Sequence, residues 1–355
     1  MGLAPELHDV ACVVHLHSVY SDGTGTVPEI ARAARRNGLD AVLLTDHDTL
    51  EARRRGEEGW HRDVLVLAGC EVSPRGRNHY LAFGLDREVD HRGLTAAQIC
   101  AAVRAAGGFG FAAHPFSRGS RRFRRARGMP FDDLDCDGLH GIELWSFVTD
   151  TAEDIESVSD ALRFVLAPGR FVRHPPHTNM ATWDRLCRTR RTVAIGGLDA
   201  HQFGRRVGPV VLRLMGYRRS FRHLRTHVLC REPLTRELEH DREQIYDALR
   251  QGRCYLSMDS VAPGRGFSFW GEGPDRALTM GAEATGGDWT LRATLPAPAE
   301  LRLLRDGAEA ARLHGSELER PAEGPGVYRV EATRRARGAE RTWIISNPIY
   351  LRERL

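Results

Sequence analysis

Histidine, aspartate and glutamate residues stand in short groups within the first two-thirds of this 355-residue chain, and most groups directly follow an apolar run. The residues in question are His15, His17, Asp22, His47, Glu71, His79, His114, Asp199 and His201. Imidazole nitrogens and carboxylate oxygens together suit borderline divalent ions such as zinc, manganese or iron. A single four-coordinate ion would leave several of these side chains unused, so the set predicts two or three divalent metal ions.

Metal ions held close together are suited to hydrolysis, because they lower the pKa of bound water and stabilise both the attacking and the leaving oxygen of a displacement. Without metal, so many imidazoles and carboxylates at buried strand ends would be costly. The residues therefore predict a metal-dependent hydrolase, above all a phosphoesterase, in which a metal-bridging hydroxide attacks phosphorus. Glu71 is the carboxylate expected to bridge two of the ions.

Alternating strands and helices are predicted to position these groups. Repeated strand–helix units favour a parallel sheet or a barrel, in which the carboxyl ends of the strands meet on one face. His15 and His17 are two residues apart, so on a strand both would point to the same side. The predicted strands cover residues 10–15, 40–45, 64–68, 78–84, 109–113, 141–145 and 192–196, and the predicted helices cover 26–38, 48–58, 95–107, 179–190 and 241–251. Thr95 and Gln98 are spaced as a capping box, which predicts the start of the third of these helices.

The character of the sequence changes from Val261 onward, where Gly and Pro are frequent and short apolar runs recur at 266–270, 289–295, 300–305, 326–332 and 341–346. This pattern predicts a small antiparallel β-sandwich. We therefore expect an α/β hydrolase domain over residues 1–260 and an all-β domain over residues 261–355. Trp270, Trp289 and Trp343 are expected to lie in the core of the second domain.

Composition narrows the possible functions. The 51 basic residues are all arginine, which excludes a Schiff-base, P-loop or kinase lysine. A net charge of +4 with both signs interspersed does not favour a dedicated nucleic-acid binder. The sequence has no apolar run of membrane-spanning length and no evident secretion signal, and its seven cysteines are scattered singly, so we expect no membrane association and a cytoplasmic location. The oligomeric state is left open.

The motifs resemble those of the polymerase and histidinol phosphatase (PHP) superfamily. They are HLHSVYSDG at 15–23, TDHD at 45–48, GCE at 69–71, His79, AHP at 113–115 and GLDAH at 197–201. The resemblance implies a distorted seven-stranded (β/α) barrel with a trinuclear metal site. The ending Ser346–Tyr350 is similar to that of PHP hydrolases with a C-terminal β-domain, the carbaryl-hydrolase-like branch among them.

The same resemblance implies how nine ligands would be shared among three ions. His15, His17, Glu71 and Asp199 would hold the first ion. Glu71 would bridge to a second ion, held also by His79 and His114. Asp22, His47 and His201 would hold the third. Asp22 stands where some members of the superfamily have histidine, which makes this third site the weakest.

The expected substrate is a small anionic molecule, a phosphomonoester or a nucleotide. The arginines near the ligands in sequence are candidates for binding its phosphate; they are Arg75, Arg77, Arg118, Arg205 and Arg206. The basic segment 118–127 follows His114 and is a candidate rim of the pocket. Asp46 is a candidate proton donor to the leaving group, or orients the neighbouring His47.

Three alternative functions remain open on the sequence. The same metal centre would serve a carboxylic ester, carbamate or amide hydrolase, which the C-terminal ending favours. An exonuclease would need a basic groove with aromatic stacking residues, and nucleic acid is therefore not the favoured partner. A non-catalytic metal-binding module is the third. Lone histidines, His223 and His227 among them, are expected to be structural.

Overall fold

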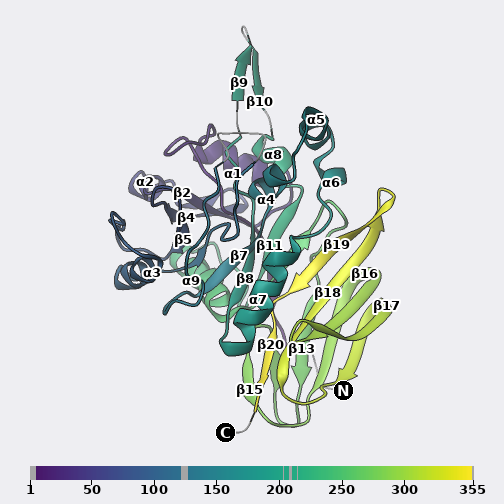
Figure 1. The fold of residues 1–355 in the computed structure, drawn as a ribbon. Helices are drawn as coiled ribbons and strands as arrows, with labels where there is room; N and C mark the ends of the chain where they lie inside the picture. Colours follow the sequence, from purple (N-terminus) through teal and green to yellow (C-terminus); the bar gives the residue numbers. More distant parts are fainter. Residues whose placement is uncertain (1–4, 121–126, 203, 208–209, 214, 354–355) are drawn as a thin grey trace.

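The computed structural model describes residues 5–120, 127–202, 204–207, 210–213 and 215–353. Figure 1 shows a mixed α/β part, purple to teal, beside a β-rich C-terminal part, green to yellow. The two parts share one hydrogen-bonded sheet, because β12 (Cys254–Met258) pairs with β19 (Ala339–Ser346). Among the described helices, none has the length and apolar character needed to cross a bilayer.

The sheet of the α/β part is mostly parallel. Its strands follow the order β1-β2-β4-β5-β6-β7-β8, and β5 alone runs antiparallel to both of its neighbours in that series. The sequence predicted parallel strands throughout, so β5 is a departure. These strands are β1 (His8–Val14), β2 (Ala41–His47), β4 (Val64–Val72), β5 (Tyr80–Phe83), β6 (Phe109–Ala112), β7 (Gly141–Ser146) and β8 (Val193–Gly197).

The last strand of this series returns to the first. The backbone N–H of Leu198 donates to the carbonyl of Val14 at 2.9 Å, and that of His17 donates to the carbonyl of Ala200 at 3.0 Å. A parallel bridge between Leu16 and Ala200 lies between them. These bonds bring the carboxyl ends of β1 and β8 together, although the two strands are almost two hundred residues apart in sequence.

Helices cover the sheet, and one of them begins at the cap that the sequence predicts. The hydroxyl of Thr95 accepts from the backbone N–H of Gln98 at 3.4 Å, and the Gln98 side chain accepts from the Thr95 N–H at 2.9 Å, which confirms the predicted capping box. The helices are α1 (Val27–Arg35), α2 (Glu51–Arg54), α3 (Ala96–Ala105), α4 (Phe147–Glu153), α5 (Val158–Leu166), α6 (Pro168–Phe171), α7 (His177–Thr189), α8 (Tyr217–Ser220) and α9 (Leu238–Gln251).

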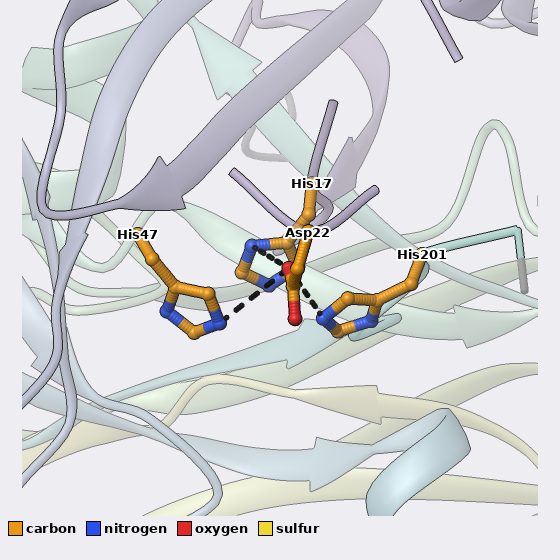
Figure 2. A group of neighbouring side chains, drawn as sticks. All are labelled: His17, Asp22, His47 and His201. Carbon is orange, nitrogen blue, oxygen red and sulfur yellow. Dashed lines mark ion pairs between the residues drawn. The ribbon is translucent and has the colours of Figure 1, made fainter. Parts of the chain in front are cut away.

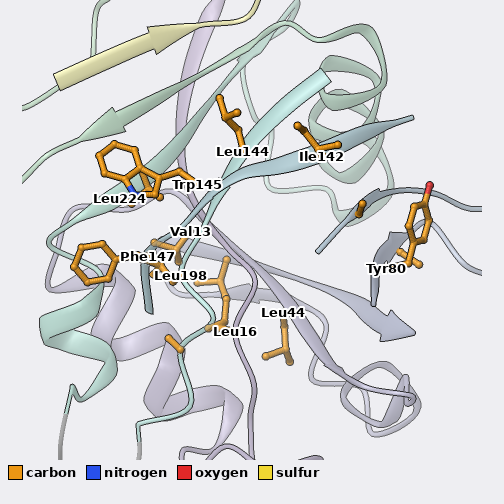
Figure 3. Packing of buried hydrophobic residues seen from close by; sticks show 14 of the residues in the cluster. Val13, Leu16, Leu44, Tyr80, Ile142, Leu144, Trp145, Phe147, Leu198 and Leu224 are labelled. Carbon is orange, nitrogen blue, oxygen red and sulfur yellow. The ribbon is translucent and has the colours of Figure 1, made fainter. Parts of the chain in front are cut away.

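Apolar side chains that point to alternate faces along the strands form a hydrophobic core on each face of the sheet. Val13 and Leu44 belong to the cluster that also holds Ile142, Leu144 and Trp145, shown in Figure 3. Cys12, Val14 and Leu43 point to the other face and pack in the cluster that includes Tyr246 and Leu249 of α9. Because side chains alternate along a strand, the sheet is apolar on both sides, as expected of a sheet covered on both faces.

The C-terminal strands are longer than the sequence predicted. The runs 289–295 and 300–305 form one strand, β16, with a register shift between Thr294 and Ala299, and its partner β17 was not predicted. Trp270, Trp289 and Trp343 are buried, as expected. The strands here are β13 (Ser268–Glu272), β14 (Ala277–Thr279), β15 (Glu283–Thr285), β16 (Thr290–Arg305), β17 (Ala308–Pro321), β18 (Gly326–Ala336), β19 and β20 (Ile349–Arg352).

Asn347 ties the C-terminal part to β8. Its side-chain oxygen accepts from the N–H of Ala194 at 2.8 Å, and its amide donates to the carbonyls of Ala194 at 2.8 Å and Cys254 at 2.9 Å. Tyr350 adds a hydrogen bond from the Thr192 N–H to its hydroxyl at 3.1 Å. The predicted boundary near residue 260 falls between β12 and β13, and the division into two domains stays a prediction.

Several segments differ from the predicted elements. The helix expected over residues 48–58 is only α2, because Gly56 takes a left-handed φ of 71° and β3 (Gly59–His61) then pairs with β4. The helices α4, α5 and α6 were not predicted, nor were β11 (Leu224–Cys230) and the hairpin of β9 (Gly204–Val207) and β10 (Val210–Arg213). Figure 1 shows this hairpin projecting from the α/β part.

Candidate metal centre

The nine predicted ligands lie in one compact cluster at the edge of the sheet. Their nitrogen and oxygen atoms fall into overlapping groups within which every ligand atom lies within 4.8 Å of the others. The groups are His17, Asp22, His47 and His201; His15, His17 and Asp199; His15, Glu71 and His114; and His47, Glu71 and His79. The groups share members, so the cluster is continuous. This grouping differs from the predicted distribution of ligands among three ions, in which His17 and Asp22 held different ions.

Three of the ligands that follow strands have an unusual backbone conformation. His15, His114 and Asp199 have positive φ angles of 61°, 29° and 50°, a region that side-chain-bearing residues rarely adopt. Such conformations cost about 1–3 kcal/mol each and persist where the surrounding structure fixes them. His15 and His17 therefore flank an isolated bridge and do not share one regular strand. The sequence argument from strand alternation was wrong about the backbone, although the two imidazoles do converge.

His79 reaches the cluster because β5 is antiparallel. It stands just before β5, whereas most other ligands follow the carboxyl end of a parallel strand. The amino end of an antiparallel strand lies at the same sheet edge as the carboxyl ends of its neighbours. One reversed strand therefore adds a ligand to this edge from the residue that precedes it.

Glu71 is the hub of the cluster. Its Oε2 lies 3.3 Å from Nε2 of His15, 3.3 Å from Nε2 of His17 and 3.2 Å from Nδ1 of His47. Its Oε1 lies 2.8 Å from Nδ1 of His79 and 3.3 Å from Nε2 of His114. Five imidazoles thus surround one carboxylate that is only 1% exposed. Burial by itself raises the pKa of Glu71, but His15, His114 and His79 outweigh it and hold the pKa well below its usual range.

An outer group lies on the more exposed side of the cluster. Figure 2 shows Asp22 between His17, His47 and His201. Oδ1 of Asp22 lies 3.1 Å from Nε2 of His201, 3.7 Å from Nε2 of His47 and 3.8 Å from Nδ1 of His17. The Asp22 side chain is 56% exposed and that of His47 is 27% exposed, so solvent reaches the cluster from this side.

Neighbouring charges shift the pKa values of residues in and beside the outer group. Burial and the charge of the neighbouring His201 together lower the pKa of His17 to about 4. Burial also lowers the pKa of His201, but Asp199 and Asp22 raise it to about 9. Burial raises the pKa of Asp199, yet His15 and His201 hold it well below its usual range. The acidic members are therefore ionised, which is the state that binds cations.

Unpartnered nitrogen atoms show that the donor set suits metal ions. Both ring nitrogens of His17 and Nδ1 of His114 are buried and have no hydrogen-bond partner among the described residues. A buried polar atom without a partner costs about 1–3 kcal/mol, and a metal ion would accept these lone pairs. Six imidazoles with three carboxylates match the ligands of zinc, manganese or iron.

Glu143, on β7, is a functional residue that the sequence reasoning missed. Its Oε1 lies 2.8 Å from Nδ1 of His15, and its Oε2 accepts from the backbone N–H of His114 at 2.6 Å. It is completely buried. The available signal was a single carboxylate inside the apolar run Gly141–Trp145, where an unpaired charge would be costly.

Asp46 holds the loop that carries Asp22. Its Oδ1 accepts from the Ser18 N–H at 2.7 Å and from the Ser21 hydroxyl at 2.6 Å, and its Oδ2 accepts from the Ser18 hydroxyl at 2.6 Å. Both oxygens are thus engaged with Ser18 and Ser21. These contacts favour a positioning role, and a catalytic role for Asp46 stays a prediction.

Three of the predicted substrate-binding arginines, Arg75, Arg77 and Arg118, have exposed side chains. Arg77 pairs with Asp132 at 3.1 Å, Arg118 pairs with Glu153 at 3.7 Å, and Arg75 is exposed. Of the described side chains, none of these three forms a hydrogen bond or ion pair with the nine ligands. Arg205 and Arg206 lie on β9, and their side chains are outside the described part, as are residues 121–126 of the basic segment. Substrate binding by these arginines stays a prediction.

Comparison with known proteins identifies part of the chain. Residues 14–112 match the family model described as PHP domain. This part of the chain is similar to PHP domains. It holds the first six of the nine ligands, from His15 to His79, whereas His114, Asp199 and His201 follow the matched segment. The fold brings these last three to the ligands of the PHP domain.

Curated relatives match only a short part of the chain. A phosphoribosyl 1,2-cyclic phosphate 1,2-diphosphodiesterase from Eggerthella lenta is 34% identical over 79 residues, which cover 21% of this chain and 30% of that protein. An error-prone DNA polymerase from Mycobacterium tuberculosis is 44% identical over 63 residues, which cover 17% of this chain and 6% of the polymerase. The chain therefore matches less than a third of the length of either relative.

A solved structure covers more of the chain. It is a two-domain protein from Bacteroides vulgatus, described as containing a "predicted PHP-like metal-dependent phosphoesterase". The match has a TM-score of 0.42 and 18% sequence identity, and it covers 96% of this chain and 95% of the other.

Proposed function

We propose that this protein is a metal-dependent phosphoesterase that hydrolyses a small phosphomonoester or a nucleotide. The observation that supports this most is the arrangement of five histidines around the buried carboxylate of Glu71. A carboxylate with both oxygens surrounded by separate imidazole groups is suited to serve two ions at once. Sites with two metal ions are common in phosphatases and nucleases.

The residues divide into an inner set around Glu71 and an outer set around Asp22 by their contacts. We infer that His15, Glu71, His79, His114 and Asp199 hold the inner ions and that Asp22, His47 and His201 hold an outer one, with His17 between them. When bound, zinc, manganese or iron ions would supply Lewis acidity and lower the pKa of water. Glu143 orients His15 through Nδ1 and fixes the His114 backbone, and Asp46 orders the loop before Asp22.

Exposure indicates where a substrate approaches. The inner side chains are at most 14% exposed, whereas Asp22 is 56% exposed, so we infer that the substrate enters beside Asp22 and His47. Little solvent reaches the inner carboxylates and imidazoles, so electrostatic interactions among them are stronger than in water. The name of the Eggerthella lenta relative specifies a phosphodiesterase, which supports phosphate esters over carbamates for this PHP domain.

We also infer the finer architecture. The hydrogen bonds between the ends of β1 and β8 support a distorted seven-stranded (β/α) barrel, and the buried cluster of the C-terminal strands supports a sandwich-like arrangement. Membership of the carbaryl-hydrolase-like branch would rest on the Ser346–Tyr350 ending, in which Asn347 bonds to β8 and Tyr350 to the residue before it.

The test is hydrolysis of p-nitrophenyl phosphate and of nucleotides by the full chain. We expect turnover that chelator abolishes, that zinc, manganese or iron restores, and that the His201→Ala variant lacks. His314→Ala, which changes an exposed histidine on β17, is the matched control and should retain full activity. Parallel assays with carbamate esters, carboxylic esters and a labelled oligonucleotide separate the alternatives. Faster turnover of any of these than of phosphomonoesters, or turnover by metal-free protein, would contradict the proposal.

A further inference from the structure

A second polar cavity lies away from the metal cluster, where the α/β part meets the turn between β18 and β19. Its volume is about 840 Å³. Four arginines and a histidine line it, together with small and apolar residues; they are Arg219, Arg222, Arg225, Arg337 and His223. None of the nine candidate ligands lines this cavity, so it is a separate site.

The cavity carries an excess of positive charge. Arg219, Arg222 and Arg337 form no ion pair with any carboxylate of the described residues, in contrast to surface arginines such as Arg312, which pairs with Glu309 at 2.7 Å. The only acidic residue among the lining residues is Asp259, and it is already engaged by Arg225 at 2.9 Å. At least three guanidinium groups around the cavity are therefore without a counter-charge.

His223 adds an unpartnered polar group to the wall. It is 5% exposed, and its Nδ1 is buried without a hydrogen-bond partner among the described residues. Its ring stacks on Phe147 with a centroid distance of 4.7 Å and an angle of 11°. Burial and the charges of Arg337 and Arg219 lower the pKa of His223 to about 3, so the ring is neutral. The sequence predicted a structural role for this histidine.

Gly169 leaves room for the guanidinium group of Arg337. A Cβ atom at this position would clash with Nη1 of Arg337 and would lie 3.5 Å from Cε1 of His223. A residue with any side chain would therefore force the Arg337 guanidinium away from His223. Guanidinium groups that line one cavity repel one another, and a bound anion would offset this repulsion.

We propose that this cavity binds a small molecule that carries one or more phosphate groups. Arginine presents a planar fork of donors that matches phosphate oxygens, and charge-assisted hydrogen bonds of this kind are strong. The volume lies within the range of small-molecule sites. Leu166, Ala167 and Pro168 line the same cavity and offer an apolar surface for the organic part of the ligand. The inference does not rest on the proposed phosphoesterase activity, because the two sites share no residue.

Calorimetry with pyrophosphate as the probe tests the site on the metal-loaded full chain at fixed ionic strength. We expect one binding event in addition to any at the metal cluster. The Arg222→Gln/Arg337→Gln variant should lose this event, with affinity falling about tenfold or more for each charge-assisted contact removed. Arg276→Gln, an exposed arginine in the C-terminal part, is the control and should bind like the wild type.

Inhibition of hydrolysis by pyrophosphate reports binding at the metal cluster and separates the two sites. The double variant should keep the wild-type inhibition constant while its calorimetric stoichiometry falls by one. Arg222 and Arg337 are exposed, so the variant should fold, and a thermal melt checks this. The single Arg219→Gln variant is a second test and should weaken the same event. Equal pyrophosphate stoichiometry and Kd in wild type and folded variants would overturn the proposal.

Discussion

Oε1 of Glu143 lies 2.8 Å from Nδ1 of His15, in the buried centre of the protein. The other carboxylate oxygen accepts from the His114 N–H at 2.6 Å, so one side chain fixes two ligands from different strands. A histidine that binds metal through one ring nitrogen commonly donates from the other to a carboxylate, which sets its tautomer and orientation. These contacts predict that Glu143 positions two ligands of the candidate metal centre.

The Glu143→Gln variant tests this role. Glutamine has one acceptor oxygen, so it can serve either His15 or the His114 N–H but not both. We expect metal affinity to fall about 10–100-fold, as for other residues that orient metal ligands. Competition with a chelating indicator measures the affinity. Glu309→Gln, on exposed β17, is the matched control, and an unchanged affinity of the Glu143 variant would contradict the positioning role.

Gly197 makes room for Glu143. A Cβ atom here would collide with Oε1 of Glu143 and would lie 2.9 Å from Cβ of His15. We expect Gly197→Ala to destabilise the fold by about 1–3 kcal/mol, since a well-packed core tolerates an extra methyl poorly, and to reduce bound metal. Chemical denaturation and elemental analysis measure the two effects. Gly315→Ala is the control, because its Cβ would meet only Leu313 at 3.7 Å. Equal stability and equal metal content of the two variants would contradict this role of Gly197.

The nine candidate ligands could be picked out from the sequence, and the structure brings them together, because most of them lie at or near the end of a strand and strand ends are visible as the limits of apolar runs. Glu143 was not predicted because it lies inside such a run and its partners are more than 25 residues away. The positive φ of His15 was equally hidden, since it depends on hydrogen bonds between β1 and β8. Local pattern therefore located the ligands, whereas the groups that orient them are fixed by long-range contacts.

The elements of the fold show the same difference between local patterns, which the sequence reveals, and long-range contacts, which it does not. The capping box at Thr95 is a local signal and is confirmed. The pairing of β12 with β19 and the bonds of Asn347 to Ala194 join segments far apart in sequence, and no local pattern encodes them. The β17 strand was missed because its burial alternates only weakly, with Leu318 its one buried residue.

His227 provides a pH-dependent contribution to stability remote from the metal cluster. Its Nδ1 lies 2.7 Å from Oδ1 of Asp9, and its Nε2 lies 3.8 Å from Oδ1 of Asp259. Burial lowers the pKa of His227, but the two carboxylates raise it above 6.5. Burial raises the pKa of Asp9 and of Asp259, yet His227 and, for Asp259, Arg225 hold both below 3.8.

The sign of the pH effect follows from these shifts. The raised pKa of His227 stabilises the fold below pH 6.5, and this contribution is lost as pH rises through the folded-state value. The lowered pKa values of the aspartates stabilise the fold above pH 3.8 and are lost as pH falls through their folded-state values. The network therefore contributes most between about pH 4 and 6.5.

The His227→Gln variant isolates this contribution. We expect its deficit in unfolding free energy relative to wild type to be about 1–3 kcal/mol at pH 5.5 and smaller at pH 9, because the contribution is lost as pH rises through the folded-state pKa of His227. Urea denaturation at the two pH values measures it. His314→Gln, on exposed β17, should show no such difference. A deficit that grows toward pH 9 would mean that His227 is neutral in the native state.

The metal ions should leave the cluster in order of exposure. Asp22 is 56% exposed and makes its shortest contact with His201 at 3.1 Å, whereas Glu71 is 1% exposed and contacts five imidazoles. We expect chelator to remove the outer ion in a fast phase and the inner ions in a slower one, because the outer ligands open directly to solvent. Asp22→Ala should lose about one equivalent of metal and the fast phase, while Asp275→Ala, an exposed aspartate of the C-terminal part, should lose neither. Elemental analysis along a chelation time course measures both. A single phase that releases all ions together from the wild type would show that the outer and inner groups act as one unit.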